Sequence, residues 1–238
     1  MATHFITAFA HRLAQLYSKL MPIPCRLCGT ACQSHALCHA CMDDLPRLGP
    51  ACPRCAQPVA QAKLCGQCQH SPPQQDISLS LFRYQQPITQ LIADFKYHQR
   101  LNLCTFFADQ ISQQLIDKKL PDLLIPIPLH PNRLAQRGYN QSLILAKVLS
   151  KKLSIPISNE HLIRVIDTQS QSSLAYKQRK NNIEHAFKLI NNNLPAHIAL
   201  IDDVLTTGHT ANTASLLLRK SGVETIELWT IARTLRHH

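Results

Sequence analysis

Eight of the ten cysteines in this 238-residue chain form four C-x-x-C pairs. The spacing C-x2-C-x9-C-x2-C occurs twice, and the second copy follows the first at an offset of 27 residues, which indicates an internal duplication. Two C-x-x-C turns can bring four thiolates to one tetrahedral zinc ion. The pattern therefore predicts two structural zinc sites, made of Cys25, Cys28, Cys38 and Cys41 and of Cys52, Cys55, Cys65 and Cys68.

Two alternatives to this interpretation stay open. The four pairs can also be cross-braced, with the first pair joined to the third and the second to the fourth, although the repeat favours the sequential arrangement. A thiol-exchange role for C-x-x-C is the other alternative, and four pairs in a loop-rich segment suit metal better. Cys32 and Cys104 lie outside the repeat and are interpreted as ordinary thiols. Closed four-thiolate shells leave no open position, so no catalysis is assigned to the metal.

A second constellation lies near the C-terminus, in the segment IALIDDVLTTGHT of residues 198–210. An apolar run ends in the carboxylate pair Asp202 and Asp203, and a loop of threonine and glycine then opens a helix. In α/β proteins, such strand ends lie at the edge of the sheet where ligands bind. Neighbouring carboxylates can accept hydrogen bonds from a ribose diol, and backbone N–H groups at a helix N-terminus form a phosphate site. Gly208 allows the backbone to approach a ligand closely.

The elements that position these residues follow a linker signal at Ser71–Pro73. Apolar strand-like runs alternate with amphipathic helical patterns, which is typical of a mainly parallel α/β sheet. We predict strands at 122–129, 161–166, 198–204 and 226–231, helices at 138–153 and 210–221, and a loop at 168–182. The predicted domains are an amphipathic N-terminal helix at 1–21, a double zinc ribbon at 22–70 and an α/β domain at 76–238.

Composition and charge exclude several classes of protein. Hydrophobic residues make up 45% and charged residues 16%, so most of the chain is expected to fold. No apolar run approaches the ~20 residues of a membrane span, and His11, Arg12 and Lys19 interrupt any export signal at the N-terminus. We therefore expect a cytoplasmic protein without a transmembrane segment. The N-terminal helix is expected to pack on the chain's own core, with attachment to a membrane surface as the alternative.

The segment at 198–210 resembles the signature for phosphoribosyl pyrophosphate (PRPP) in type I phosphoribosyltransferases. This resemblance implies that Asp202 and Asp203 bind the ribose hydroxyls and that magnesium accompanies the pyrophosphate. It also implies that the 5′-phosphate lies against a loop of five residues, Thr206, Thr207, Gly208, His209 and Thr210.

Further segments narrow the family. They are YxxPIxxLIxxFKY at 84–97, PIPL at 126–129 followed by RGYNQS at 137–142, and QxxL at 171–174 with Arg179, Asn181 and the pair Ala186-Phe187. Together with the C-x-x-C pairs, they resemble the ComF family, the group of competence protein ComFC and its relative GntX, from about Pro22 to Arg233. Tyr139 stands where the family usually has Phe, and His209 where a small residue is common.

The ComF resemblance implies a mainly parallel type I phosphoribosyltransferase fold with a small N-terminal four-cysteine zinc-ribbon module. In this alignment, Arg133 and Arg137 belong to a pyrophosphate loop, and residues 168–180 form a loop that closes over PRPP. Asn140 and Gln141 are equally compatible with helix capping and with ligand contact. Lys96 can reach a phosphate, although a solvated helix face is the more common role for such a lysine.

Three functions remain open at this stage. The resemblance implies a competence protein that binds PRPP and handles single-stranded DNA during natural transformation, with the competence helicase and a recombination mediator as partners. The net charge of +11 suits a nucleic-acid backbone, and we assign DNA contacts to Lys177, Arg179 and Lys180. Aromatic residues make up only 5%, which argues against a base-stacking platform. The alternatives are an active phosphoribosyltransferase with an unidentified acceptor, and a PRPP sensor that does not bind DNA.

Overall fold

The computed structural model describes residues 23–32, 36–97, 101–166 and 186–235. Contacts between Cα atoms divide the chain into two compact units, residues 1–45 and 46–238. The boundary falls between the two cysteine repeats, so the second repeat belongs to the same unit as the sheet. The predicted N-terminal helix at 1–21 and the predicted loop at 168–182 lie outside the described residues.

Within the described residues, the first unit contains a short hairpin and one short helix. Strands β1 (Ile23–Pro24) and β2 (Ala31–Cys32) pair antiparallel around the first C-x-x-C turn, and helix α2 (His39–Asp43) begins directly after Cys38, inside the second C-x-x-C pair. No helix in the described ranges is long and apolar enough to cross a membrane.

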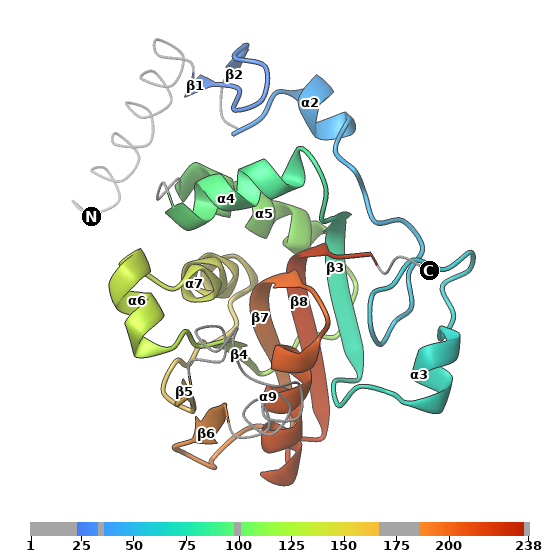
Figure 1. Ribbon diagram of the computed structural model, residues 1–238, viewed down its shortest axis with the longest axis vertical. Coiled ribbons are helices and arrows are strands. Elements are labelled where there is room, and N and C mark those ends of the chain that lie inside the picture. Colours follow the sequence, from blue (N-terminus) through green and yellow to red (C-terminus); the bar gives the residue numbers. More distant parts are fainter. Residues whose placement is uncertain (1–22, 33–35, 98–100, 167–185, 236–238) are drawn as a thin grey trace, which may run out of the picture. The chain divides into compact units, whose positions relative to one another are not determined.

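The second unit is built on a sheet of four parallel strands in the order β3-β8-β7-β4 (Figure 1). These strands are β3 (Ile77–Arg83), β4 (Leu123–Pro126), β7 (His197–Leu205) and β8 (Thr225–Arg233). The helices among the described residues of this unit are α3 (Gly66–His70), α4 (Ile88–Tyr97), α5 (Leu101–Gln113), α6 (Pro131–Arg137), α7 (Gln141–Leu153) and α9 (His209–Lys220). The expected α/β class with a mainly parallel sheet is therefore confirmed.

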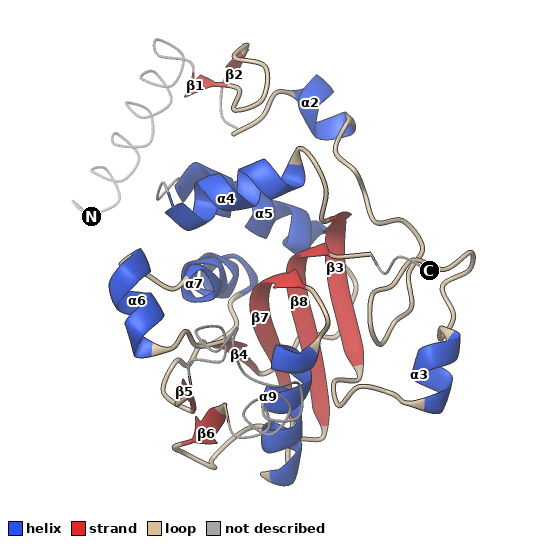
Figure 2. Cartoon of the chain, in the orientation of Figure 1, coloured by secondary structure: helices blue, strands red, loops and turns tan. Residues whose placement is uncertain are grey.

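Helices cover both faces of the sheet, so the central strands β7 and β8 are buried on both sides (Figure 2). Residues 198–201 are fully buried, and Ile198 and Leu200 share a core cluster with Ala214 and Leu218 of α9. Helices α4, α5 and α7 lie on the opposite face (Figure 2), with Leu145 of α7 fully buried. This two-sided burial explains why the strands read as unbroken apolar runs in the sequence.

Three elements differ from the sequence prediction. The sheet begins at β3, ahead of the helical segment at 84–97, in a run where serine alternates with apolar residues and Ser80 hydrogen-bonds Thr230 at 2.5 Å. The stretch predicted as a pyrophosphate loop at 126–138 contains helix α6. The predicted strand at 161–166 does not join the main sheet: β5 (Leu162–Arg164) pairs antiparallel with β6 (Phe187–Leu189).

Candidate functional site

The two cysteine repeats have the same local structure. Cys25 N–H donates to the Thr30 carbonyl at 2.7 Å, and Cys52 N–H donates to the Gln57 carbonyl at 2.8 Å, which is the same bond shifted by 27 residues. Helices α2 and α3 begin directly after the third cysteine of their repeats. The duplication seen in the sequence is therefore also a duplication of the fold.

The thiols gather in the sequential arrangement, and the cross-braced alternative is not adopted. The sulfur atoms lie within 4.8 Å of one another in each of two groups, Cys25, Cys28, Cys38 and Cys41, and Cys52, Cys55, Cys65 and Cys68. One Sγ–Sγ distance in each group is 3.6 Å, between Cys28 and Cys38 and between Cys55 and Cys65. A tetrahedron with zinc–sulfur bonds of about 2.3 Å has edges of about 3.8 Å, so both groups fit zinc.

In each group the first cysteine has a lowered pKa, whereas the pKa of the last is raised, for Cys41 chiefly by hydrogen bonds to neighbouring thiols and for Cys68 chiefly by burial. Burial opposes ionisation of Cys25, but N–H donors of Cys28, Cys38 and Leu27 lower its pKa to about 6. Cys52 is similar, and its pKa is lowered to about 7 by N–H groups despite burial. Thiolate is the form that binds zinc. All ten cysteines are free thiols, and neither Cys32 nor Cys104 belongs to a group of four.

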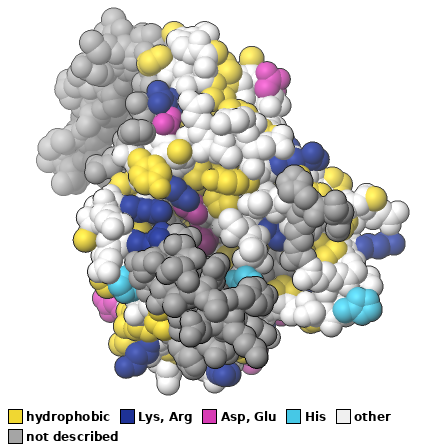
Figure 3. Space-filling view, in the orientation of Figure 1, with side chains coloured by type: hydrophobic (Ala, Val, Ile, Leu, Met, Phe, Trp, Pro, Cys, Tyr) yellow, Lys and Arg dark blue, Asp and Glu magenta, His cyan; other side chains and the backbone are white. Residues whose placement is uncertain are grey.

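A cleft of about 360 Å³ opens at the carboxyl ends of the parallel strands. Residues predicted for ligand binding line it together, although they come from two separate parts of the chain: Arg133, Arg137, Asp202, Asp203, Thr206, Thr207, His209 and Thr210. In Figure 3, acidic side chains lie in a hollow near the middle of the view with Lys and Arg side chains beside it. The cleft thus combines a carboxylate pair with a basic rim.

Strand β7 carries the acid pair near its carboxyl end, and the loop that follows leads directly into α9. Gly208 is the N-cap of α9 and has a φ of +84°, a left-handed conformation that suits glycine. A Cβ at this position would be 3.6 Å from Leu205, so the backbone angle and not crowding disfavours another residue. The turn aims the helix N-terminus at the cleft, where Thr207 and Thr210 lie.

The two carboxylates have different partners. Asp202 Oδ1 accepts hydrogen bonds from Ser142 Oγ at 3.0 Å and from the Asp203 N–H at 2.9 Å. Asp203 Oδ2 lies 2.7 Å from Lys96 Nζ. Loss of hydration and the neighbouring charge of Asp203 raise the pKa of Asp202 to about 7, although its hydrogen bonds and Lys96 oppose this rise. Asp202 therefore gains or loses a proton readily near neutral pH.

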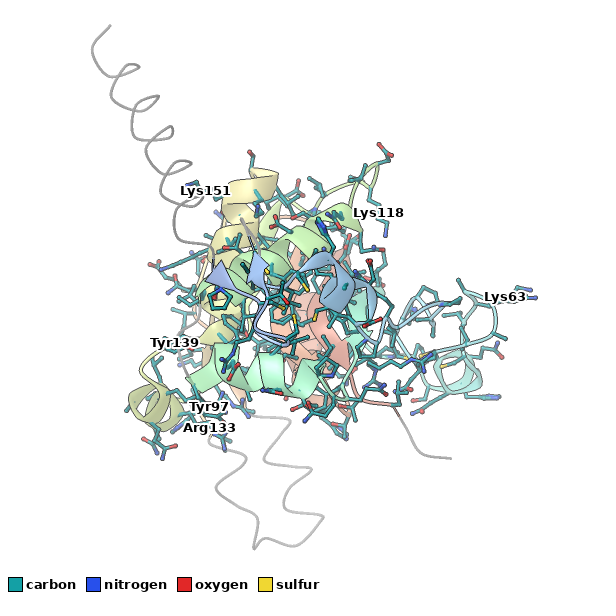
Figure 4. The ribbon with its side chains drawn as sticks, turned by 90° about the horizontal axis from the view of Figure 1, so that it is seen from above. Lys63, Tyr97, Lys118, Arg133, Tyr139 and Lys151 are labelled. Atoms are coloured by element: carbon teal, nitrogen blue, oxygen red, sulfur yellow. The ribbon has the colours of Figure 1, made fainter. Side chains whose placement is uncertain are left out.

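Helix α6 supplies the basic rim. Arg137 donates to Gln141 Oε1 at 3.3 Å and lies over the Tyr97 ring at 5.6 Å. Figure 4 places Tyr97 and Arg133 on the same side of the molecule, whereas Lys151 of α7 lies away from them. Three further predicted residues, Lys177, Arg179 and Lys180, lie outside the described residues.

At the junction of α6 and α7, Asn140 caps the second helix, whereas Gln141 both contacts α4 and lines the cleft. Asn140 caps α7, because its Oδ1 accepts from the N–H groups of Ser142 and Leu143, and its side-chain amide donates to the Ile127 carbonyl. Gln141 donates to the Lys96 carbonyl at 3.2 Å and also lines the cleft. The Tyr139 hydroxyl, the departure from the usual Phe, donates to the Phe95 carbonyl. These bonds fix α4, and with it Lys96, beside the acid pair.

Several cleft residues were not assigned to ligand binding from the sequence: Tyr84, Ser142, Arg164 and Phe187. For Lys96 the sequence left both phosphate contact and a solvated helix face open; its side chain is 18% exposed, pairs with Asp203 and lines the cleft. Its position at the end of α4, two residues after the buried Asp94 and next to Phe95, is the only local signal that it faces inward.

Comparison with known proteins agrees with this arrangement. Residues 16–69 match the family described as "Double zinc ribbon domain". Competence protein F of Haemophilus influenzae is 36% identical over 209 residues, and the match covers 84% of this chain and 91% of that protein. DNA utilization protein YhgH of Salmonella typhimurium is 30% identical over 227 residues, which covers 90% of this chain and 99% of that protein.

Two further similarities are more distant. Competence protein ComFC of Bacillus subtilis is 29% identical over 212 residues, covering 83% of this chain and 84% of its own. The match to the solved structure of a purine phosphoribosyltransferase from Pyrococcus horikoshii covers 58% of this chain and 85% of that chain, with 17% identity and a TM-score of 0.34. Because the match to Competence protein F is 36% identical and covers most of both chains, this chain belongs to the ComF family.

Proposed function

We propose that the cleft binds PRPP. The observation that supports this most is the acid pair Asp202 and Asp203, which lies at the carboxyl end of a parallel strand, directly before a helix N-terminus and opposite two arginines of α6. The cleft therefore contains a partner for each group of PRPP: carboxylates for the diol, a helix N-terminus for the phosphate and arginines for the diphosphate. A site for phosphate alone has no use for two carboxylates, because they repel it.

Each part of PRPP has an assigned partner in this proposal. The carboxylates of Asp202 and Asp203 accept hydrogen bonds from the 2′- and 3′-hydroxyls. The loop at 206–210 receives the 5′-phosphate through its N–H groups and threonine hydroxyls. Arg133 and Arg137 neutralise the diphosphate with charge-assisted hydrogen bonds. Magnesium, bound with the diphosphate, supplies further positive charge.

The biological role that we propose is the handling of single-stranded DNA during natural transformation. Its support is the family: relatives of this chain are named for competence and for DNA utilization. The net charge of +11 suits a phosphate backbone, and Lys177, Arg179 and Lys180 are the proposed contacts. The competence helicase and a recombination mediator are the proposed partners, with the cytoplasm as the compartment.

A second candidate function is transfer of the phosphoribosyl group to an acceptor. One observation favours it: Phe187 and Ala186 give the basic cleft an apolar wall, with Arg164 lying 5.6 Å from the Phe187 ring centroid. A purely regulatory PRPP site needs no such wall. Release of pyrophosphate from PRPP in the presence of a mixture of nucleobases and amines would support transfer, and its absence would leave binding as the function.

The sharpest test of PRPP binding uses the sugar. Ribose 5-phosphate and 2-deoxyribose 5-phosphate differ only in the hydroxyl that the acid pair is proposed to read. We expect the ribose form to bind more tightly by at least about tenfold, because a hydrogen bond to a charged group contributes roughly 1.5–3 kcal/mol. Equal affinities for the two sugars would show that the cleft takes phosphate without reading a diol. The variant Lys151→Ala, on the outer side of α7, serves as a matched control for nonspecific charge.

A further inference from the structure

Arg233 connects the second cysteine group to the loop that precedes α9. It is only 1% exposed although it carries a charge. Its Nε donates to the Cys55 carbonyl at 2.9 Å, and its Nη1 donates to the Leu205 carbonyl at 2.7 Å and also to the Thr206 carbonyl. One side chain thus holds the first C-x-x-C turn of the second repeat, which ends at Cys55, and the first residue of the proposed phosphate loop.

The bonds to Leu205 and Thr206 determine the direction of two peptide groups. In a trans peptide, the C=O and the following N–H point in opposite directions. Because Arg233 holds both carbonyls, the N–H groups of Thr206 and Thr207 are directed away from the guanidinium. Thr206 and Thr207 line the cleft, so Arg233 fixes donors of the kind that receive a phosphate.

The other end of the connection depends on the cysteine group. The turn that contains Cys55 is shaped by two of the four thiols, and its carbonyls face the sheet: Ser78 N–H donates to the Pro53 carbonyl at 2.7 Å, and Ser78 Oγ to the Arg54 carbonyl at 2.6 Å. Four thiolates around one zinc carry a net charge of −2, which offsets the charge of the buried guanidinium nearby. Because Cys52 and Cys55 belong to this group of four, we expect loss of the metal to alter the turn and with it the Cys55 carbonyl that Arg233 binds.

The segment after the last cysteine makes a second connection, to the body of α9. Gln74 N–H donates to Asn212 Oδ1 at 2.8 Å, in the first turn of that helix. Arg219 lies 2.5 Å from Asp76 Oδ2 and donates to the Gln74 carbonyl at 3.0 Å. Both sides of the second cysteine group are thus anchored to the strand–loop–helix segment that carries the proposed phosphate site.

We infer that Arg233 is a positioning residue that couples metal occupancy of the second cysteine group to the shape of the phosphate loop. The inference rests on the proposed binding of PRPP. By reciprocity, bound PRPP must stabilise the metal in the second group by the same factor with which this metal strengthens PRPP binding. The first cysteine group belongs to the other unit and lacks this coupling.

The test measures the rate at which a chelator removes zinc, with and without PRPP and Mg²⁺. Cys25→Ser retains only the second zinc site, and Cys65→Ser retains only the first. We expect PRPP to slow zinc release from Cys25→Ser by about tenfold, within the usual range for coupled sites, and to leave release from Cys65→Ser unchanged. Wild-type protein, which needs no substitution to fold, should show one protected and one unprotected ion.

Two variants then test Arg233 itself. Arg233→Lys keeps the charge but cannot bridge three carbonyls, so PRPP protection of the second zinc should disappear and PRPP affinity should fall about tenfold. Arg83→Lys is the matched control, because Arg83 is exposed and pairs in register with Arg233 on the neighbouring strand. It should retain both protection and affinity.

The outcomes separate this inference from the proposed function. If wild-type protein binds PRPP but both of its zinc ions leave at rates that PRPP does not change, the coupling is wrong and the binding proposal stands. If Arg233→Lys retains full protection, the coupling does not run through Arg233. If wild-type protein does not bind PRPP at all, the proposed function fails and this inference fails with it.

Discussion

The two cysteine groups have the same spacing and the same backbone hydrogen bonds, yet their surroundings differ. Cys28 in the first group is exposed, and this group lies in a small unit of its own. In the second group, Cys52 is completely buried, and the carbonyl of Cys55 is bonded to the core arginine Arg233. The spacing of the cysteines determines which four thiols gather around a metal ion. The hydrogen bonds of the surrounding backbone carbonyls determine which other parts of the fold the metal site stabilises.

One equivalent pair of positions shows how the copies diverged. Gly29 and Ala56 occupy the same place in the two repeats, and both have positive φ, +78° and +54°. The glycine has nothing within 4 Å of a would-be Cβ, whereas Ala56 is 1% exposed and belongs to the core cluster of the sheet. The second copy accepts an unfavourable backbone angle, and its methyl group packs into the core.

The largest expected difference between the groups is in stability. Zinc contributes an apparent ~10–16 kcal/mol to small zinc-dependent folds, which is comparable with the whole stability of a domain. We expect Cys52→Ser to lower the melting temperature of the sheet unit by more than about 10 °C. Cys25→Ser should leave this transition within about 2 °C of wild type. Each variant should contain one zinc ion by elemental analysis; equal melting shifts would contradict the division of roles.

A second prediction asks whether either zinc group contributes to DNA binding. If Lys177, Arg179 and Lys180 contact three phosphates, replacing all three by Ala should reduce the slope of log affinity against log salt by about 2 for single-stranded DNA. Fluorescence anisotropy of a labelled oligothymidine between about 50 and 200 mM salt measures this slope. Cys25→Ser should retain the wild-type slope. An unchanged slope in the triple variant would place the DNA contacts elsewhere, with the first zinc group as the next region to examine.

The pKa of Asp202 predicts that ligand binding in the cleft depends on pH. This carboxyl group has a pKa of about 7, and only its ionised form accepts both ribose hydroxyls. Affinity for ribose 5-phosphate should therefore rise about tenfold between pH 6 and pH 8, as the carboxyl loses its proton. Asp202→Asn should bind more weakly and lose most of this rise. If the variant retains the full rise, titration of the ligand phosphate is its cause.

The raised pKa also predicts an effect on folding. The native state holds this proton at pH values where the unfolded chain has lost it, so the contribution of Asp202 to stability falls as pH rises from about 4 to 7. Denaturant unfolding of Asp202→Asn should show a smaller loss of stability over this range than wild-type protein.

The smallest expected effect concerns the equivalent positions Gly29 and Ala56. Gly29→Ala should destabilise the first zinc group by about 1 kcal/mol, because the left-handed backbone disfavours a side chain and no neighbour packs against the added methyl. Ala56→Gly should change stability less, since relief of backbone strain offsets the lost burial. Zinc affinity measured by chelator competition reports both effects. A stabilising effect of Gly29→Ala would contradict the contrast between the two copies.

Local features of the sequence predicted most of the chemistry. The cysteine repeat and the segment at 198–210 each concentrate their chemistry-bearing residues within a short stretch, so spacing was sufficient to predict the two cysteine groups and to propose a ligand site at the acid pair. The roles of Ser142 and Arg233 were missed, and that of Lys96 was left open, because all three depend on packing between elements far apart in the chain: Lys96 contacts Asp203, Ser142 contacts Asp202, and Arg233 contacts Cys55. No pattern within one element reports such pairings.

The fold was predicted best where burial is two-sided. Strands β4 and β7 contain short apolar runs, and β8 is buried along nearly its whole length, whereas β3 alternates serine with apolar residues. Helix α6 was missed because prolines dominate the stretch before it, although Pro131 at its first turn and Gly138 after its end are common helix boundaries.

The central claim, that the acid pair in the cleft of the sheet unit reads a ribose phosphate, is tested most directly by calorimetric titration with PRPP and Mg²⁺. The proteins to compare are wild type, Cys25→Ser and the double variant Asp202→Asn, Asp203→Asn. We predict equal affinities for wild type and Cys25→Ser, and a loss of about 100-fold or more in the double variant, in which hydrogen bonds to both charged acceptors are weakened. An unchanged affinity in the double variant would contradict the claim.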